Sequence, residues 1–180
     1  IQNRQIRLAG VGGQGLALAG EILATAAGLI EGRYVAQVEF HGANQRGGPS
    51  RAEIVISDEE IAYPAIGRTD VLLAMTPQAL NDYLPTAKEH SLVIVDSTHI
   101  SDAPPSAARV CALPLTQMAR DLGAEISVNI IALSALVALS GVVSEEALRQ
   151  AVLSRLPART HELNKSALLA GKQAAEQYIL

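Results

Sequence analysis

The residues best suited to chemistry form a glycine-rich segment near the start of the chain. Gly10, Gly12 and Gly15 have the spacing G-x-G-x-x-G, between an apolar stretch typical of a strand and one typical of a helix. Glycine backbone lets an anion approach closely, and the first N–H groups of the helix can donate to it. The segment, which includes Gly13 and Gln14, therefore predicts an anion-binding loop. The alternative is that its glycines only allow strand and helix to pack closely.

A second glycine-rich segment, residues 41–50, could add a cation to this site. Arg46 stands there before Gly47 and Gly48. Its guanidinium can donate two parallel hydrogen bonds to a carboxylate or phosphate, and the backbone of the two glycines can join it. A solvated arginine in a turn is the alternative. Because the segment follows the next strand, we expect it at the same edge of the sheet as the first glycine loop.

The other polar residues offer no complete catalytic arrangement. Asp96, Ser97 and Thr98 follow a central strand, where open α/β sheets bind ligands, but a turn that ends the strand explains them equally well. The four histidines have no metal-binding spacing. Cys111 is the one cysteine, and it is expected to be a small buried side chain. We therefore predict no catalytic residue and no metal site on this chain.

Strands and helices alternate around the glycine loop until about residue 113. The segments 34–40 and 51–57 are joined by a short loop, so we expect them to pair antiparallel and make the sheet mixed. The alternation in 51–57 predicts a strand with one solvent-exposed face. Strands are predicted over 5–9, 34–40, 51–57, 70–75, 91–96 and 108–113, and helices over 14–29 and 77–83.

Helices alone are predicted beyond residue 113, over 115–122, 127–139, 144–156 and 161–178. The helix at 127–139 is apolar nearly all round, so it must be buried in the core or against a partner. Asn129 and Asn164 interrupt apolar helices, and each is expected to tie two elements together by hydrogen bonds, with a ligand role as the alternative. The pattern predicts a single α/β domain over residues 1–180, a three-layer Rossmann-like fold with a mixed sheet and a helical C-terminal part.

The composition favours a subunit of a larger assembly. Hydrophobic residues make up 49% of the chain and charged residues 18%, which suggests buried contact faces. A net charge of −4 without a basic segment, together with 3% aromatic residues, argues against nucleic-acid binding. The most apolar run, 128–143, is too short and too interrupted to span a membrane. We find no targeting pattern, and we expect a cytoplasmic protein.

The order of several motifs resembles one known family. GVGGQG at 10–15, QRGG at 45–48 before an antiparallel strand, and a C-terminal block follow one another. In that block Asn129 opens NIIALSALVALSGVVSEEAL, and the tripeptide 162–164, ELN, precedes Ala170-Gly171. Together these motifs resemble the gamma subunit, or gamma domain, of the 2-oxoacid:ferredoxin oxidoreductases over nearly the whole chain.

The resemblance implies a subunit of an enzyme that oxidatively decarboxylates a 2-oxoacid such as 2-oxoglutarate or pyruvate, commonly to an acyl-CoA, and reduces ferredoxin. It implies that companion subunits hold thiamine pyrophosphate and iron–sulfur clusters, and that CoA is a substrate of the complex. This sequence has no G-D-G…N-N thiamine motif, and one cysteine cannot hold an iron–sulfur cluster alone. The isolated chain is therefore expected to hold no cofactor and to be inactive. The sequence does not decide whether it forms a homodimer.

The resemblance also assigns a role to the two glycine loops, as places for CoA phosphates or for contact with the thiamine-bearing subunit. The residues concerned are Gly10, Gly12, Gly13, Gln14, Gly15, Arg46, Gly47 and Gly48. The segment HGANQ at 41–45 is closer to the indolepyruvate enzymes, whereas 59–64 and 144–171 look more like the 2-oxoglutarate type. The choice of 2-oxoacid is left open.

Two other functions are compatible with the glycine loop alone. A stand-alone NAD(P)-dependent dehydrogenase would place an acidic residue at the end of the second strand, about 20 residues after the glycines, to bind a ribose hydroxyl. Glu31 has that spacing but precedes the strand, and Glu39 lies too far along. The other alternative is a regulatory module that binds CoA or another anion without turnover.

Overall fold

A six-stranded mixed sheet forms the centre of the molecule, and the structure, a computed structural model, describes residues 3–43 and 47–179. Its strands are β1 (Arg4–Val11), β2 (Tyr34–His41), β3 (Pro49–Ser57), β4 (Thr69–Ala74), β5 (Ala87–Asp96) and β6 (Arg109–Leu113). Their order is β2-β3-β1-β4-β5-β6. β3 is antiparallel to β1 and β2, and the other neighbouring pairs are parallel. The predicted antiparallel pair is confirmed.

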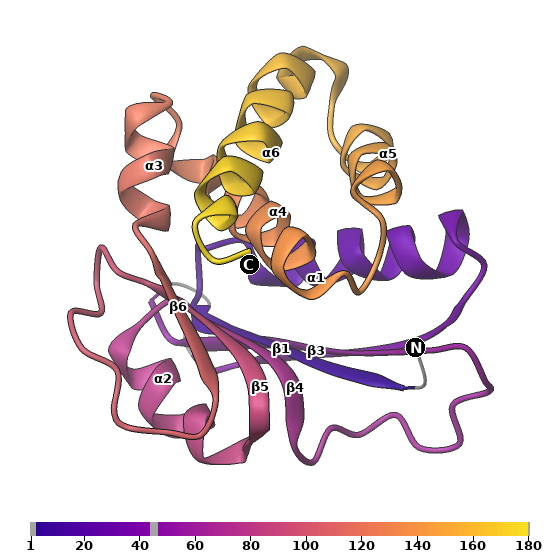
Figure 1. Cartoon of the computed structure of the whole chain (residues 1–180). Coiled ribbons are helices and arrows are strands. Elements are labelled where there is room, and N and C mark those ends of the chain that lie inside the picture. Colours follow the sequence, from indigo (N-terminus) through magenta and orange to yellow (C-terminus); the bar gives the residue numbers. More distant parts are fainter. Residues whose placement is uncertain (1–2, 44–46, 180) are drawn as a thin grey trace.

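The helices cover the two faces of the sheet unequally. They are α1 (Leu16–Thr25), α2 (Pro77–Tyr83), α3 (Leu115–Asp121), α4 (Val128–Ser140), α5 (Glu145–Arg155) and α6 (His161–Glu176). Short helical turns are η1 (Ala26–Ile30), η2 (Leu84–Thr86), η3 (Glu125–Ser127) and η4 (Ala158–Thr160). Figure 1 shows α1, α4, α5 and α6 on one face and α2 on the other. The predicted three layers are present, with one thick and one thin outer layer.

Several element boundaries differ from the sequence pattern, most clearly those of α1 and β5. α1 begins at Leu16 rather than at 14, because Gly15 is left-handed, with a φ of 71°, and cannot continue a helix. After Thr25 the chain continues as a π turn through Ile30. β5 begins at Ala87 rather than at 91, and its register with β4 shifts after the first pair. The polar residues 88–90 lie in that irregular part, which explains why they do not have the pattern of a strand.

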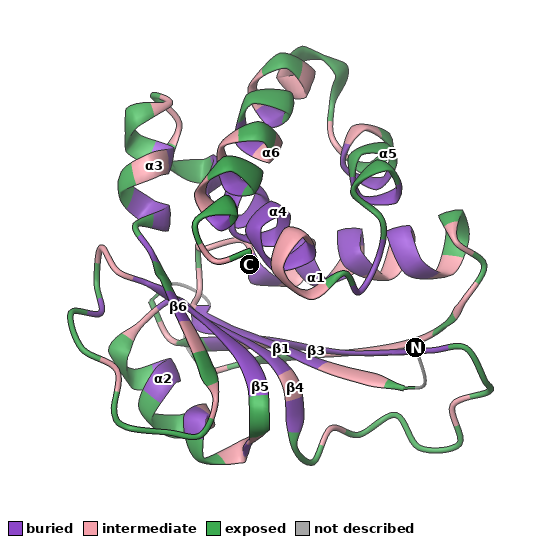
Figure 2. Cartoon of the chain, in the orientation of Figure 1, coloured by how far each residue is buried: buried purple, intermediate pink, exposed green. Residues whose placement is uncertain are grey.

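The thick layer is built around α4. Residues 128–137 of this helix are all buried, so the predicted burial is confirmed within the chain itself (Figure 2). α6 packs along α4, and at Gly171 the helices meet so closely that a Cβ would lie 2.2 Å from the carbonyl oxygen of Ile131. The C-terminal helices are therefore fixed to the sheet through α4.

The opposite face of the sheet buries charge. The alternation in 51–57 predicts a solvent-exposed face, but β3 is buried from Ala52 to Ser57, so this prediction is wrong. Glu53 is 7% exposed, and its Oε1 accepts hydrogen bonds from Nε of Arg7 at 2.9 Å and Nε of Arg51 at 3.1 Å. Arg7 also donates to the Thr86 hydroxyl in η2, at 2.7 Å. Mutual pairing under α2 and η2 lets Arg7 and Glu53 leave water, whereas the Arg51 side chain stays partly exposed.

Asp96 and its neighbours form a turn that ends the strand, which is the alternative to a ligand site. The Asp96 carboxylate is fully buried, and Oδ1 accepts from the backbone N–H of Thr98 at 3.1 Å. Its Oδ2 accepts from the Thr116 hydroxyl, and the Ser97 N–H donates to the carbonyl of Leu113 at 2.8 Å. The aspartate thus joins the end of β5 to the start of α3.

Cys111 is buried in the core, as predicted, and burial raises the pKa of its thiol. Among the helices that the structure describes, none has the length and apolar character needed to cross a membrane.

Candidate ligand-binding site at the glycine loop

The first glycine loop is a tight turn that leads from β1 into α1. Gly13 and Gly15 have left-handed φ angles of 96° and 71°. Gly10 is enclosed, because a Cβ there would lie 2.1 Å from Oε1 of Gln14. This Oε1 accepts a hydrogen bond from the Val11 N–H at 2.9 Å. The carboxamide oxygen of Gln14 therefore closes the loop on itself, and the glycines allow both the turn and the close packing.

The structure brings the two glycine loops together at the end of the sheet where β1 finishes. β1 ends at Val11 opposite Pro49, and the Gly12 N–H donates to the carbonyl oxygen of Gly48 at 2.8 Å. The backbone N–H of Gly12 is therefore already used within the chain. Gly47 is exposed, with a left-handed φ of 77°. Arg46 lies outside the described residues, so its predicted role stays a prediction.

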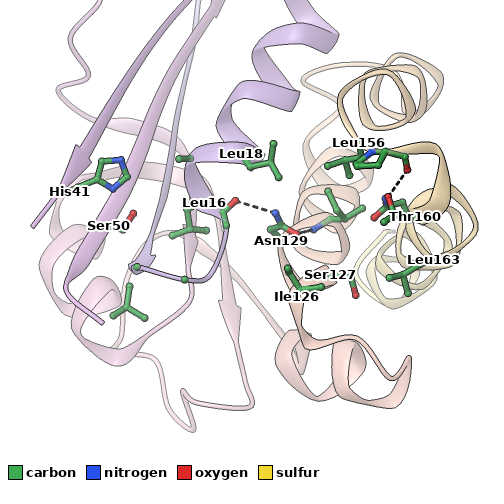
Figure 3. A pocket seen from close by; sticks show the side chains of 18 residues that line it. Leu16, Leu18, His41, Ser50, Ile126, Ser127, Asn129, Leu156, Thr160 and Leu163 are labelled. Atoms are coloured by element: carbon green, nitrogen blue, oxygen red, sulfur yellow. Dashed lines mark hydrogen bonds between the residues drawn. The ribbon is translucent and has the colours of Figure 1, made fainter. Parts of the chain in front are cut away.

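A cavity of about 470 Å³ lies beside the first loop (Figure 3). The glycine loop and the start of α1 form one side, and η3, α4 and the connection between α5 and α6 form the other. Figure 3 shows His41 and Ser50 on the sheet side and Ile126, Asn129 and Leu163 opposite. The apolar side chains that line it include Leu16, Leu18, Ile126, Ile130, Leu156 and Leu163.

The N-terminal residues of three helices line this cavity. They are Leu16–Leu18 of α1, Asn129 and Ile130 of α4, and Leu163 and Asn164 of α6. Helix N-termini carry partial positive charge, so their convergence favours an anion. At the start of α4 the Ile130 N–H is already used, because it donates to Oδ1 of Asn129 at 2.9 Å. Among the described lining residues His41 is the one ionisable side chain, and no carboxylate opposes an anion. The Nε2 of His41 lies 3.5 Å from Oε2 of Glu39.

The two asparagines both line the cavity but have different partners. Asn129 donates from Nδ2 to the carbonyl oxygen of Gly15 at 3.1 Å, so its predicted role in tying two elements together is confirmed. A Cβ at Gly15 would lie 2.5 Å from the same Nδ2. Asn164 instead donates from Nδ2 to the hydroxyl of Thr160 at 3.0 Å, which is a local bond. α4 is thereby anchored to the glycine loop, whereas Asn164 stabilises the start of α6.

The arrangement is suited to binding rather than to catalysis. It combines glycine-loop and helix N–H groups with an apolar wall, so it can receive a ligand that has both an anionic group and an apolar part. In residues 3–43 and 47–179 there is no cluster of three or more His, Cys, Asp or Glu side chains that could hold a metal ion.

The sequence patterns did not reveal the apolar wall of the site. Ile126 and Leu156 lie outside the regular helices, and Ile126 is 83% exposed. An exposed isoleucine just before a buried helix is the one local signal that could have indicated a binding surface. The cavity joins the glycine loop to residues that lie more than a hundred positions later in the sequence, and only the packed fold brings them together.

Comparisons with known proteins identify the family of the chain. A family model described as pyruvate ferredoxin/flavodoxin oxidoreductase matches residues 5–174. The 2-oxoglutarate synthase subunit KorC of Methanothermobacter marburgensis is 40% identical over 177 residues, which cover 94% of this chain and 95% of the relative. The ketoisovalerate oxidoreductase subunit VorA of Methanothermobacter thermautotrophicus is 31% identical, over 97% of this chain and 37% of the relative.

Among solved structures, the gamma subunit of a keto/oxoacid ferredoxin oxidoreductase from Geobacter sulfurreducens is 42% identical, with a TM-score of 0.85. The match covers 96% of this chain and 98% of that subunit. The similarity therefore extends over the sheet, the glycine loop and the C-terminal helices together.

Proposed function

Since the chain belongs to the pyruvate ferredoxin/flavodoxin oxidoreductase family, as a gamma subunit of a 2-oxoacid:ferredoxin oxidoreductase, we propose that its complex oxidises 2-oxoglutarate. The observation that carries this proposal is the 40% identity to a 2-oxoglutarate synthase subunit over nearly the whole length of both chains. Identity to the ketoisovalerate relative is 31%. The reaction would convert 2-oxoglutarate and CoA to succinyl-CoA and CO₂, with two electrons passed to ferredoxin.

The companion subunits would hold the thiamine pyrophosphate and the iron–sulfur clusters. The described part of this chain has one cysteine, and it is buried, which agrees with iron–sulfur clusters being held by other subunits. The test is to purify the complex and compare kcat/KM for 2-oxoglutarate, pyruvate, 2-ketoisovalerate and indolepyruvate. The proposal expects 2-oxoglutarate to have the highest value, and a higher value for any of the others would overturn it.

We further propose that the cavity at the glycine loop receives a phosphate and the adjoining apolar part of CoA. The N–H groups of Gly13 and Gly15, which have no acceptor among the residues that the structure describes, and the start of α1 would donate to the phosphate. Leu16, Leu18 and Leu163 would contact the apolar part. Contact between this surface and the thiamine-bearing subunit is the second candidate, favoured by the 83% exposure of Ile126 at the cavity.

A pair of matched variants tests the CoA site. Gly13→Ala adds a Cβ where nothing lies within 4 Å, so it causes no clash, but the φ of 96° strains any residue other than glycine and so disturbs the loop that would receive the phosphate. Gly32→Ala is the control, because it has a φ of 69°, equally open space, and a place before β2, away from the cavity. We expect Gly13→Ala to raise the KM for CoA about tenfold, equivalent to roughly 1.4 kcal/mol.

The outcome separates the two candidates. A raised KM for CoA in Gly13→Ala, with normal assembly and a normal KM in Gly32→Ala, supports the CoA site. Loss of the companion subunits from Gly13→Ala during purification would instead assign the surface to a subunit contact. Unchanged kinetics and unchanged assembly would remove both roles from the loop.

A further inference from the structure

The two edges of the sheet are protected to different degrees. β6 is short, and its outer side is closed by the C-terminal segment of the chain. The Tyr178 hydroxyl accepts from the Ala112 N–H at 3.1 Å and donates to the Ala112 carbonyl at 3.0 Å. Arg109 donates to the Tyr178 carbonyl as well. This edge therefore cannot add another strand.

The β2 edge is open. Its eight residues pair with β3 in an unbroken register, and in the described part of the chain β2 has no other strand partner. None of its residues is buried. The strand YVAQVEFH contains no Pro, Gly or Lys and no bulge, and Glu39 near its end is the one acidic residue, so it has few of the features that prevent edge-to-edge pairing. A long, regular edge without these features favours pairing with another strand.

The side chains of β2 have a definite pattern. Val35 packs against the helical core, so the odd-numbered residues face α1, and the even-numbered residues face the side of α2 by alternation. The even-numbered residues are Tyr34, Ala36, Val38 and Phe40, a continuous apolar row. Tyr34 is 52% exposed and Phe40 39% exposed. Phe40 is held in place by the Arg51 guanidinium, 3.7 Å from the ring centre.

We propose that β2 pairs antiparallel with β2 of a second copy of this chain, about a two-fold axis at Gln37. In this register Tyr34 lies opposite Phe40 of the other copy, and Ala36 lies opposite Val38. All four residues of the apolar row then meet residues of the same row, and aromatic pairs of this kind stabilise antiparallel strands. The two sheets join into one continuous sheet.

The charges of β2 agree with a second copy as the occupant. Glu39 is the one carboxylate of the strand, and it lies opposite Val35 in this register, so no like charges face each other. Two-fold symmetry makes every favourable pair occur twice. A shift of the axis to Val38 would place Tyr34 opposite Gly42 and lose both aromatic pairs.

The first test measures the mass of the isolated full chain by sedimentation equilibrium across the micromolar range. We expect twice the 18.9 kDa of one chain. Ala36→Lys puts a charge into the centre of the pairing and should give the mass of one chain, whereas Ala112→Lys, an exposed position on the other edge strand, should leave the dimer intact. A wild-type chain with the mass of a monomer, or a dimer that survives Ala36→Lys, would overturn the proposal.

The second test fixes the register. Gln37→Cys places two thiols opposite each other at the axis, and the native Cys111 is buried. Mild oxidation should link most Gln37→Cys chains into covalent dimers and few Val38→Cys chains. Equal linking of both variants, or preferential linking of Val38→Cys, would overturn this register.

Discussion

The two faces of the sheet are stabilised by different kinds of contact. The face under α4 is packed with apolar side chains, and at Gly171 α6 lies so close to α4 that there is no room for a Cβ. The face under α2 has a smaller apolar cluster, and beside it lies the buried pair of Arg7 and Glu53, with the partly exposed Arg51 bonded to the same carboxylate. Apolar packing tolerates small changes, whereas a buried charge that loses its partner has no substitute in the protein. The faces should therefore respond differently to single substitutions.

The largest effect is expected from removing the shared carboxylate on the α2 face. Glu53→Ala leaves the guanidinium of Arg7, a residue that is 5% exposed, without its carboxylate partner. We expect a loss of about 3–5 kcal/mol in the free energy of unfolding, because an uncompensated charge stays buried. Urea denaturation of the isolated chain measures this loss.

The control removes both charges together. In the double variant Arg7→Met, Glu53→Leu the buried guanidinium is removed with its carboxylate. Arg51 also loses Glu53, but its side chain is 30% exposed and still donates to the Tyr83 hydroxyl, so most of the lost stability should return. A double variant that is as unstable as Glu53→Ala would mean that shape, rather than charge pairing, determines the stability of this face.

An intermediate effect is expected where α6 crosses α4. Gly171→Ala places a Cβ 2.2 Å from the Ile131 carbonyl oxygen and 2.8 Å from Cβ of Ser134, so the helices must move apart. We expect a loss of about 1–3 kcal/mol, as for overpacked cores. Gln173→Ala, exposed on the same helix, should leave the urea midpoint nearly unchanged. Equal effects of the two variants would contradict the close packing.

The smallest effect is expected from a polar contact within the apolar face. The Ser134 hydroxyl of α4 donates to the Leu168 carbonyl of α6. Ser134→Ala should cost about 0.5–1.5 kcal/mol, the usual value of one neutral hydrogen bond. Ser140→Ala, which removes a bond to Leu136 within α4 and a long bond from the Val142 N–H but no contact with α6, serves as the comparison in thermal melts. A larger loss in Ser140→Ala would mean that the contact between α4 and α6 contributes little.

The same difference between the faces decides what could be predicted from the sequence. The apolar periods identified the burial of residues 127–139, because an apolar helix has no other stable environment. The buried strand β3 was misjudged, because Arg51 and Glu53 look like the solvent side of an alternating strand. The burial of Glu53 depends on Arg7, which is more than 40 residues away in the sequence, and no local pattern contains that pairing.

The candidate site was predicted in part. The strand–glycine–helix pattern located the loop, and the topology brought residues 10–15 and 47–50 together at one edge. The apolar wall of the cavity comes from η3, α4 and the α5–α6 connection, which only the packed fold brings to the loop. The hydrogen bond from the Gly12 N–H to the Gly48 carbonyl could not be predicted from the spacing of the glycines, since it depends on the register of β1 with β3.

The most direct test of the central claim is amide hydrogen exchange at single-residue resolution in the assembled complex, with and without CoA. If CoA phosphate binds the glycine loop, exchange at Gly13, Gly15 and Leu16 should slow on addition of CoA. The Gly12 N–H already donates to Gly48 within the chain, so its exchange should change little and serves as the internal control. Unchanged exchange at Gly13, Gly15 and Leu16 at saturating CoA would contradict the claim.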